Sequence, residues 1–297
     1  MIVITAPTGL IGTQVLRHLL DTAAFDSPEP IRVVVRDPAR LADAIRERVE
    51  VVKGSHRDAS VVDRAFAGAD AVFWLVPPQP QAPSPQAAYV DFSRAACEAF
   101  TRHGVGRVVG VSALGRGTPM AGRAGHVTAS LAMDDMITAT GVPYRALALP
   151  SFMDNIARQA ASITGDGVFY GTMAGSSTFP TCATRDIAAV AARLLLDRDW
   201  SGQGSVPVLG PEDLSFDDMA AILADVLGRP VRYQRVPGAA YKAQLVNGGM
   251  SEAMAQGMLD MFAAKDDGLD NAEPRTPAAS SPTTFRQWCE TQWPDTP

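Results

Sequence analysis

The chain has 297 residues, of which 46% are hydrophobic and 20% are charged, so it is long enough for one large domain or slightly more. A formal net charge of −6 argues against a general affinity for nucleic acid or anionic membranes, and no apolar run approaches the length of a membrane span. The three cysteines lack metal or disulfide spacing, and Met1 leads directly into the first predicted strand, so we expect no metal site, no signal peptide and a cytoplasmic protein.

The first twelve residues predict a strand, a turn of small residues and the start of a helix. Ile2–Ile4 is a short β-branched run, typical of a strand that is buried on both faces. The helix is amphipathic, and its apolar side comprises Leu10, Ile11, Val15, Leu16, Leu19 and Leu20. Glycine in such a turn lets the backbone approach a pyrophosphate, and the free N–H groups of a helix start bind anions. We therefore expect a dinucleotide to contact Ala6, Thr8, Gly9, Leu10, Ile11 and Gly12.

Arg36 directly follows the second predicted strand, Ile31–Val35. In a dinucleotide fold the residue at this place contacts the adenosine ribose. A carboxylate suits the 2′-hydroxyl of NAD(H), whereas an arginine suits the 2′-phosphate of NADP(H). Arg36 therefore predicts NADP(H), with a solvated arginine at a strand end as the structural alternative. Asp37 can also act in its place.

Two more strands are predicted before residue 80. Val49–Val52 leads to Asp58, which either accepts a hydrogen bond from the adenine amine or caps the predicted helix Ala59–Phe66. Both interpretations stay open. Ala71–Val76 ends in a turn whose backbone can pass the cofactor ribose, formed by Val76, Pro77 and Pro78.

Alternation of strands and helices continues after a proline-rich loop, Pro77–Pro85, whose Ser84 caps the next helix. Arg107–Ser112 is the fifth strand, and its last residue places a hydroxyl at the ligand edge. The glycine-rich segment 113–125 predicts a mobile loop beside the nicotinamide. Next come a helix and a sixth strand, predicted at Thr128–Thr140 and Val142–Leu149.

Beyond residue 156 the alternation loosens. Gly165–Phe179 predicts an irregular hairpin, Arg185–Leu196 an amphipathic helix, and Ser205–Leu209 a last strand of the main sheet. Ser215 and Thr284 have the side chains that begin helices, and each stands before an apolar helical pattern.

Together these elements predict an α/β fold, with a doubly wound parallel sheet of the Rossmann type and helices on both faces. We expect the Rossmann domain over 1–155, with 182–209 returning to it. A smaller, mostly helical substrate-binding cap is expected over 156–181 and 210–297.

Short motifs along the chain form a recognisable set: Thr5–Gly12, Arg36, Gly54–Asp58, Val76–Pro78, Val111–Ser112, Gly141–Tyr144, Phe152–Asn155, Gly210–Ser215 and Gly228–Pro230. Together they resemble the NmrA-like group of atypical short-chain dehydrogenases/reductases. The C-terminal helices show a looser similarity to the ergot-alkaloid agroclavine and festuclavine dehydrogenases. The resemblance implies a Rossmann domain with a small cap, a preference for NADP(H), and reduction of quinones, imines or alkenes. The group also includes redox-sensing regulators that bind the dinucleotide without evident turnover.

The sequence departs from the family pattern in three places. Ala6 replaces the first glycine of the turn, and alanine favours a φ below zero, which weakens the expected cofactor affinity. Many members carry a lysine one turn before an acidic residue, and counting back from Gly141 places the acidic residue at Asp134 and the lysine position at Ser130. No tyrosine has a lysine four residues later, so alcohol dehydrogenation by a tyrosine acid is not expected.

Hydride transfer requires an acceptor held close to the cofactor and protected from water. A cationic iminium acceptor needs no protein acid, whereas a quinone or enone needs a proton donor for its oxygen. The candidate donors are Ser112, Tyr170 and His126, of which histidine is the usual general acid near neutral pH. For His126 a solvated position on the loop is the alternative.

The exit of the sixth strand supplies the expected pocket residues. Phe152 is expected against the cofactor, and the substrate contacts are expected from Phe152, Met153, Asn155 and Tyr170. A stripe at helical spacing either belongs to the core or forms a soft lid over an apolar substrate: Met250, Met254, Met258, Met261 and Phe262.

The sequence therefore predicts an NADPH-dependent reductase of secondary metabolism that acts on a C=N, C=C or quinone acceptor in a fairly apolar small molecule. An NADP(H)-sensing regulator without turnover and a non-redox isomerase or cyclase on the same fold remain alternatives. The oligomeric state stays open.

Overall fold

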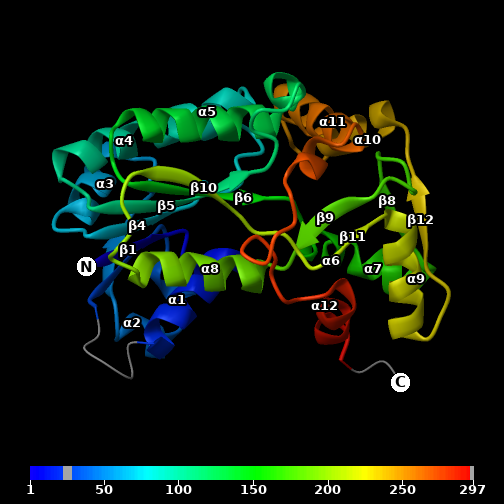
Figure 1. Cartoon of the computed structure of the whole chain (residues 1–297), viewed down its shortest axis with the longest axis horizontal. Helices are drawn as coiled ribbons and strands as arrows, with labels where there is room; N and C mark the ends of the chain where they lie inside the picture. The colour runs from blue at the N-terminus through cyan, green and yellow to red at the C-terminus, as the bar shows by residue number, and fades with distance from the viewer. Residues whose placement is uncertain (23–28, 295–297) are drawn as a thin grey trace.

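A seven-stranded parallel sheet forms the centre of the computed structural model, which describes residues 1–22 and 29–294 (Figure 1). The strand order is β10-β6-β5-β4-β1-β2-β3, and neighbouring strands are parallel throughout. In chain order the strands are β1 (Ile2–Thr5), β2 (Ile31–Val35), β3 (Glu50–Lys53), β4 (Ala71–Trp74), β5 (Arg107–Ala113), β6 (Tyr144–Leu149) and β10 (Gln203–Pro207). Because the strands are parallel, the segments that follow them meet at one edge, which is where such sheets bind ligands.

Helices cover both faces of this sheet (Figure 1). On one face, α1 (Leu10–Thr22) and α8 (Thr184–Leu196) lie side by side. On the other face lie α3 (Ala59–Phe66), α4 (Phe92–Arg102) and α5 (His126–Ala139). The short helix α2 (Asp43–Arg46) precedes β3. The predicted Rossmann-type α/β fold is therefore confirmed.

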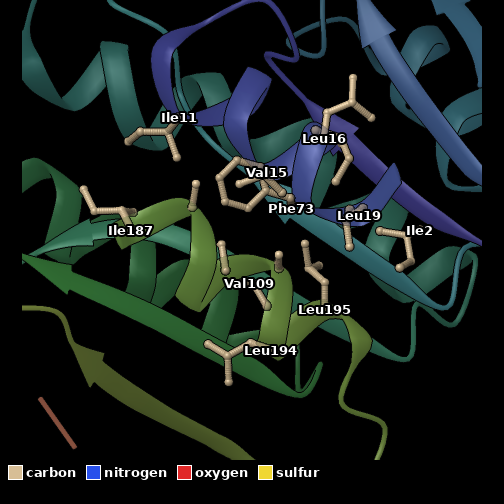
Figure 2. Packing of buried hydrophobic residues seen from close by; sticks show 14 of the residues in the cluster. Ile2, Ile11, Val15, Leu16, Leu19, Phe73, Val109, Ile187, Leu194 and Leu195 are labelled. Atoms are coloured by element: carbon tan, nitrogen blue, oxygen red, sulfur yellow. The ribbon is translucent and has the colours of Figure 1, made fainter. Parts of the chain in front are cut away.

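The apolar core between α1, α8 and the sheet is seen from close by in Figure 2. Val15 and Leu16 of α1 face Phe73 of β4, and Ile187 and Leu195 approach from α8; all five side chains are fully buried. Burial of a side chain of this size stabilises the fold by about 2 kcal/mol. The spacing of these residues explains why both helices lie flat on the sheet.

The second half of the chain adds two small sheets beyond the carboxyl edge. One contains β7 (Ser151–Phe152), β9 (Phe179–Cys182) and β11 (Asp213–Leu214), and the other contains β8 (Val168–Gly171) and β12 (Arg232–Arg235). The helices around them are α6 (Asp154–Ala157), α7 (Ala160–Asp166), α9 (Phe216–Leu227), α10 (Gly238–Asn247), α11 (Glu252–Asp266) and α12 (Phe285–Gln292). Of these, α11 crosses the top of the molecule and contacts α5 (Figure 1).

The hairpin predicted at 165–179 is wrong. The strand β8 pairs in parallel with β12, and β9 pairs with β7 and β11 instead of with β8. Two strands that stand close together in sequence therefore join different sheets. Since the choice of a partner strand depends on distant residues, the local pattern did not contain this information.

Several boundaries also differ from the sequence-based expectation. β4 ends at Trp74 instead of Val76, α5 begins at His126 instead of Thr128, and β10 covers Gln203–Pro207. Leu10 does not belong to the apolar side of α1, because 62% of its surface is exposed. It stands in the first turn of the helix, beside the turn that follows β1.

The three cysteines of the chain, Cys97, Cys182 and Cys289, are buried free thiols. Burial raises the pKa of Cys97 and Cys289 to about 12, and it raises the pKa of Cys182 well above its usual range. Within the residues that the structure describes, no helix is long and apolar enough to cross a bilayer. The same residues contain no cluster of side chains that could hold a metal ion.

The capping box of α9 provides a test of the local structure. Ser215 Oγ accepts from the Asp218 N–H at 3.1 Å, and the Asp218 carboxylate accepts from the Ser215 N–H at 3.0 Å. We expect Ser215→Ala to lower the free energy of unfolding by about 1 kcal/mol, because it leaves a helix-start N–H without its acceptor. Urea denaturation measures this, with the exposed Ser60→Ala in α3 as the control, which should change the stability by less than about 0.5 kcal/mol.

Candidate cofactor site and proton network

The turn between β1 and α1 is held in one conformation by a close backbone approach. A Cβ on Gly12 would lie 2.1 Å from the carbonyl oxygen of Ala6, so only glycine lets α1 lie this close to the turn. The Gly9 N–H donates to the same carbonyl at 3.1 Å. Thr13 Oγ1 donates to the Pro7 carbonyl at 2.8 Å and fixes the other side of the turn.

Ala6 adopts a φ of +50°, the left-handed conformation that normally favours glycine. The preference of alanine for negative φ does not prevail here, because the turn imposes this backbone angle on whichever residue follows β1. For a residue with a Cβ, this conformation costs about 1 to 2 kcal/mol. Formation of the turn therefore strains the backbone at Ala6.

The residues of this turn differ in exposure. Gly9 and Leu10 are exposed, Ala6 and Thr8 are half-buried, and Ile11 and Gly12 are buried. The exposed backbone at Gly9, with the free N–H groups at the start of α1 beside it, fits the phosphate groups of a dinucleotide. Ile11 contributes to the core instead.

Arg36 lies next to this turn because Thr5 of β1 pairs with Val34 of β2. Its side chain is exposed and makes no hydrogen bond or ion pair with the part of the chain that the structure describes. Asp37 is occupied, since its carboxylate accepts from the Ala39 N–H at 3.1 Å and caps a short 3-10 helix. The guanidinium is therefore available to an external anion, whereas the neighbouring carboxylate has a structural role.

Asp58 occupies the N-cap position of α3, but its exposed carboxylate makes no capping hydrogen bond. His56, two residues earlier, was missed by the sequence analysis. It is 6% exposed, its Nε2 donates to the Leu75 carbonyl at 3.0 Å, and its ring meets the rings of Trp74 and Phe92 edge to face. It joins the segment after β3 to the segment after β4. The only local feature that could have indicated this role of His56 was its position between Gly54 and Asp58.

The exit of β4 is fixed by Thr5, whose Oγ1 donates to the Phe73 carbonyl at 2.8 Å and accepts from the Leu75 N–H at 3.0 Å. The predicted turn follows, with Val76 and Pro77 half-buried and Pro78 exposed. Its backbone thus leaves the sheet at the same edge as Gly9 and Arg36.

Ser112 belongs to a buried network at the end of β5. Its Oγ donates to the carboxylate of Asp134 in α5, and the hydroxyl of Tyr144 in β6 donates to the other carboxylate oxygen at 2.6 Å. Asp134 is 3% exposed, and burial raises the pKa of its carboxyl group to about 6, against the opposing effect of both hydroxyl donors. Ser130, one helical turn earlier, is also buried.

His126 is neither an accessible acid nor a solvated loop residue. It is the first residue of α5, is 8% exposed, and its Nε2 donates to the Met254 carbonyl of α11 at 3.0 Å. Burial lowers its pKa. Tyr89, in the π-helical turn Ala87–Asp91, meets its ring edge to face. The donor expected here therefore connects α5 to α11, which comes more than a hundred residues later.

The other expected pocket residues lie in different surroundings. Phe152 is half-buried, whereas Met153 is 1% exposed and belongs to a core cluster with residues of β9 and α9. Asn155 is exposed in α6. Tyr170 is 38% exposed on β8, where Gln159 binds its backbone N–H and carbonyl.

The residues of the methionine stripe also differ in how deeply they are buried. Met254 is buried and receives the hydrogen bond from His126, while Met258, Met261 and Phe262 are half-buried. Met261 packs against the cluster around Leu131, and Phe262 packs against the core of the C-terminal part. Core packing accounts for much of the stripe.

A cleft of about 560 Å³ lies between α5 and α11, and Arg123, Thr128, Asp260 and Asp267 are among its lining residues. Arg123 and Asp267 face each other across it at 3.6 Å. The lining does not include Gly9, Arg36 or Ser112. This cleft is therefore distinct from the carboxyl edge where those three residues lie.

The close approach at Gly12 has a matched control in Gly9. We expect Gly12→Ala to lower the free energy of unfolding by more than about 2 kcal/mol, because its Cβ would overlap the Ala6 carbonyl. A Cβ on Gly9 would meet the same oxygen at 3.5 Å, an ordinary contact, so Gly9→Ala should cost less than about 1 kcal/mol. Urea denaturation of both variants tests this, and equal losses would contradict it.

His56 should make the stability depend on pH. Burial, opposed by the Leu75 carbonyl, lowers its pKa from 6.5 to about 4, so between these values the unfolded chain binds a proton that the folded chain does not. This contribution to stability is present above pH 6.5 and falls by about 2 kcal/mol between pH 7 and pH 5. The destabilisation caused by His56→Phe should shrink by that amount over the same range. A difference that is constant with pH would contradict this prediction.

Comparison with known proteins agrees with this geometry. A sequence model of the family described as NAD(P)H-binding matches residues 7–198. The NAD(P)H azoreductase of Xenophilus azovorans is 28% identical over 263 residues, covering 89% of this chain and 86% of that one. The (4-alkanoyl-5-oxo-2,5-dihydrofuran-3-yl)methyl phosphate reductase of Streptomyces griseus is 32% identical over 238 residues, covering 80% and 77%.

The same fold occurs in a crystal structure of an NADPH-dependent quinone oxidoreductase of Escherichia coli in complex with NADPH. The two structures superpose with a TM-score of 0.80 at 22% identity, over 99% of this chain and 100% of the other. The family match extends from the turn after β1 to the end of α8 and so includes the carboxyl edge of the sheet. The chain therefore belongs to the NAD(P)H-binding family and, within it, to the NmrA-like atypical short-chain dehydrogenases/reductases.

Proposed function

We propose that this chain, an NAD(P)H-dependent oxidoreductase, transfers a hydride from NADPH to a C=N, C=C or quinone acceptor in a fairly apolar small molecule. The observation that carries the proposal is that an exposed glycine turn and an exposed arginine, Arg36, lie at the same edge of the sheet. The named activities of the relatives, on azo compounds, a furanone phosphate and quinones, support reduction as the reaction type.

The cofactor contacts in this proposal come from the carboxyl edge. The turn at Ala6, Thr8 and Gly9, with Leu10 beside it, holds the pyrophosphate, and Arg36 binds the 2′-phosphate through its planar guanidinium. Asp58 and the backbone of Val76, Pro77 and Pro78 line the adenosine side. The exposed Gly9 backbone supports this arrangement, because no side chain there stands in the way of a phosphate.

NADPH supplies the hydride when it is bound. The protein orients the acceptor, excludes water from it and provides a proton. Ser112, which is 6% exposed and stands at the carboxyl end of β5, is the proton donor in this proposal. The His126 Nε2 is hydrogen-bonded to the Met254 carbonyl of α11, and Tyr170 lies on β8, in a separate sheet. No tyrosine of the chain is followed by a lysine four residues later, which argues against the alcohol chemistry of typical short-chain dehydrogenases. Iminium acceptors need no donor, whereas enones and quinones use Ser112.

The C-terminal part covers the acceptor in this proposal, as a cap formed by 156–181 and 210–297. Two contacts support it. A Cβ on Gly115 would lie 2.5 Å from Leu269, and a Cβ on Gly125 would lie 2.0 Å from the Gly257 carbonyl, so both ends of the loop after β5 pack against α11 and the residues after it. Phe152 and Asn155 face the acceptor from the sheet side. Exclusion of water by such a cap favours hydride transfer.

Arg36 provides the test of cofactor choice. We expect Arg36→Ala to weaken NADPH binding by about 30-fold, or about 2 kcal/mol, because a hydrogen-bonded ion pair with the 2′-phosphate is lost. NADH binding should change by less than about threefold. Isothermal titration with both cofactors measures this, with Arg17→Ala on the exposed side of α1 as the control. An equal loss for NADPH and NADH would contradict the assignment.

Turnover itself is tested by loss of NADPH absorbance with an iminium, an enone and a quinone, each at saturating cofactor. We expect at least one acceptor class to be reduced. NADPH binding without reduction of any of them would contradict the proposed reaction and favour a redox sensor. Failure to bind either form of the dinucleotide would leave a non-redox role on the same fold.

A further inference from the structure

The Asp134 carboxylate lies inside the protein between α5 and the sheet, with a hydroxyl group on each of its oxygens. Ser112 comes from β5 and Tyr144 from β6, so one carboxylate joins three elements. A buried carboxylate of this kind ties secondary structure together. Ser112, however, is the second-last residue of β5 and stands at the edge where the proposed cofactor and acceptor bind.

Few other charged groups surround this carboxylate. A guanidinium nitrogen of Arg116, in the loop after β5, lies 3.7 Å from the oxygen that Ser112 contacts, and Arg116 also binds Asp135 at 2.8 Å. Asp135 is exposed and adjacent on α5. The Cys97 thiol of α4 adds a smaller effect to burial and Asp134, which together raise the pKa of Tyr144 well above its usual range. Arg116 is half-exposed, so it connects the buried carboxylate with solvent.

The protonation state of Asp134 decides what Ser112 can do. An ionised carboxylate accepts the single hydroxyl proton of Ser112, and the serine oxygen can then only accept a hydrogen bond from a ligand. A protonated carboxyl group can donate to the serine oxygen instead. The serine proton is then free to turn toward the acceptor.

We propose that Asp134 is a positioning residue that sets the direction of the Ser112 hydroxyl and refills its proton, so that enone and quinone reduction requires Asp134 to be protonated. The proposal rests on the reductase function proposed above. A hydride adds to the conjugated acceptor carbon, and the displaced electron pair moves to the carbonyl oxygen. That oxygen takes the Ser112 proton, Ser112 takes the Asp134 proton, and Asp134 is left ionised until solvent returns one proton.

The surroundings of Asp134 fit this task. Burial raises its pKa to about 6, while the hydroxyl groups of Ser112 and Tyr144 and the Arg116 charge act in the opposite direction. The carboxyl group therefore gains and loses its proton slightly below neutral pH. An ordinary aspartate would be ionised throughout this range and would leave Ser112 without a proton to give.

The experiment compares pH profiles between two acceptor classes. For the wild-type protein, kcat for an enone or quinone should be constant below about pH 6 and fall tenfold per pH unit above it. The kcat for an iminium should not show this decline, because a cationic acceptor takes no proton from the protein. Asp134→Asn should abolish the decline and lower enone reduction at pH 6 by more than about tenfold.

Two variants that leave the Ser112–Asp134 pair in place should move the midpoint in opposite directions. Tyr144→Phe removes a hydrogen bond to the ionised carboxylate and should raise the midpoint, while Asp135→Asn removes a nearby negative charge and should lower it. A purely structural network would change stability without moving a pH midpoint. These two pH profiles distinguish a proton-transfer role of Asp134 from a purely structural one even if Asp134→Asn does not fold.

The outcomes separate this inference from the proposed function. If no acceptor is reduced at any pH, the reductase proposal fails and this inference fails with it. If enone and iminium reduction share one pH profile, or if only iminium ions are reduced, the reductase proposal stands and the role of Asp134 is overturned. Midpoints that move as stated support the role of Asp134.

Discussion

The contact between Gly12 and the Ala6 carbonyl is the constraint on which the rest of the structure depends. It allows the first turn of α1 to lie directly against the end of β1, which aims the free N–H groups of the helix at the carboxyl edge. The same approach places Val15 and Leu16 on the sheet, where α8 lies beside them. The strained φ of Ala6 is a consequence of this packing. The exposed turn and the apolar core thus both depend on one backbone contact.

Much of the main sheet could be predicted because its signals are local. Buried β-branched runs mark β1 and β2, and the side chains of Ser215 and Thr284 mark the starts of α9 and α12. The C-terminal part was predicted less well. In β8, Val168 pairs with Arg232, 64 residues later. The local sequence around either strand does not identify the other as its partner. Partner choice depends on packing between distant segments, and a local pattern does not record it.

The candidate site also contains residues with local sequence signals and residues whose surroundings depend on distant contacts. Local signals single out Gly9 and Arg36: Gly9 stands in the turn between β1 and α1, and Arg36 directly follows β2. His126 was misjudged because its burial depends on Met254, in a helix 128 residues away. Counting along the chain located Asp134, but only the fold shows that Ser112 and Tyr144 share its carboxylate. Histidine, serine and aspartate have the same local pattern whether solvated or buried, so their protonation behaviour follows from tertiary contacts alone.

The burial of the three thiols affects the resistance of the protein to alkylation by electrophilic compounds. Enones and quinones are electrophiles that add to thiolates, and the thiolate form is the reactive one. Each cysteine of this chain is enclosed and has a raised pKa, so each remains protonated and out of reach at neutral pH. Buried thiols of this kind are protected from alkylation by electrophiles such as enones and quinones.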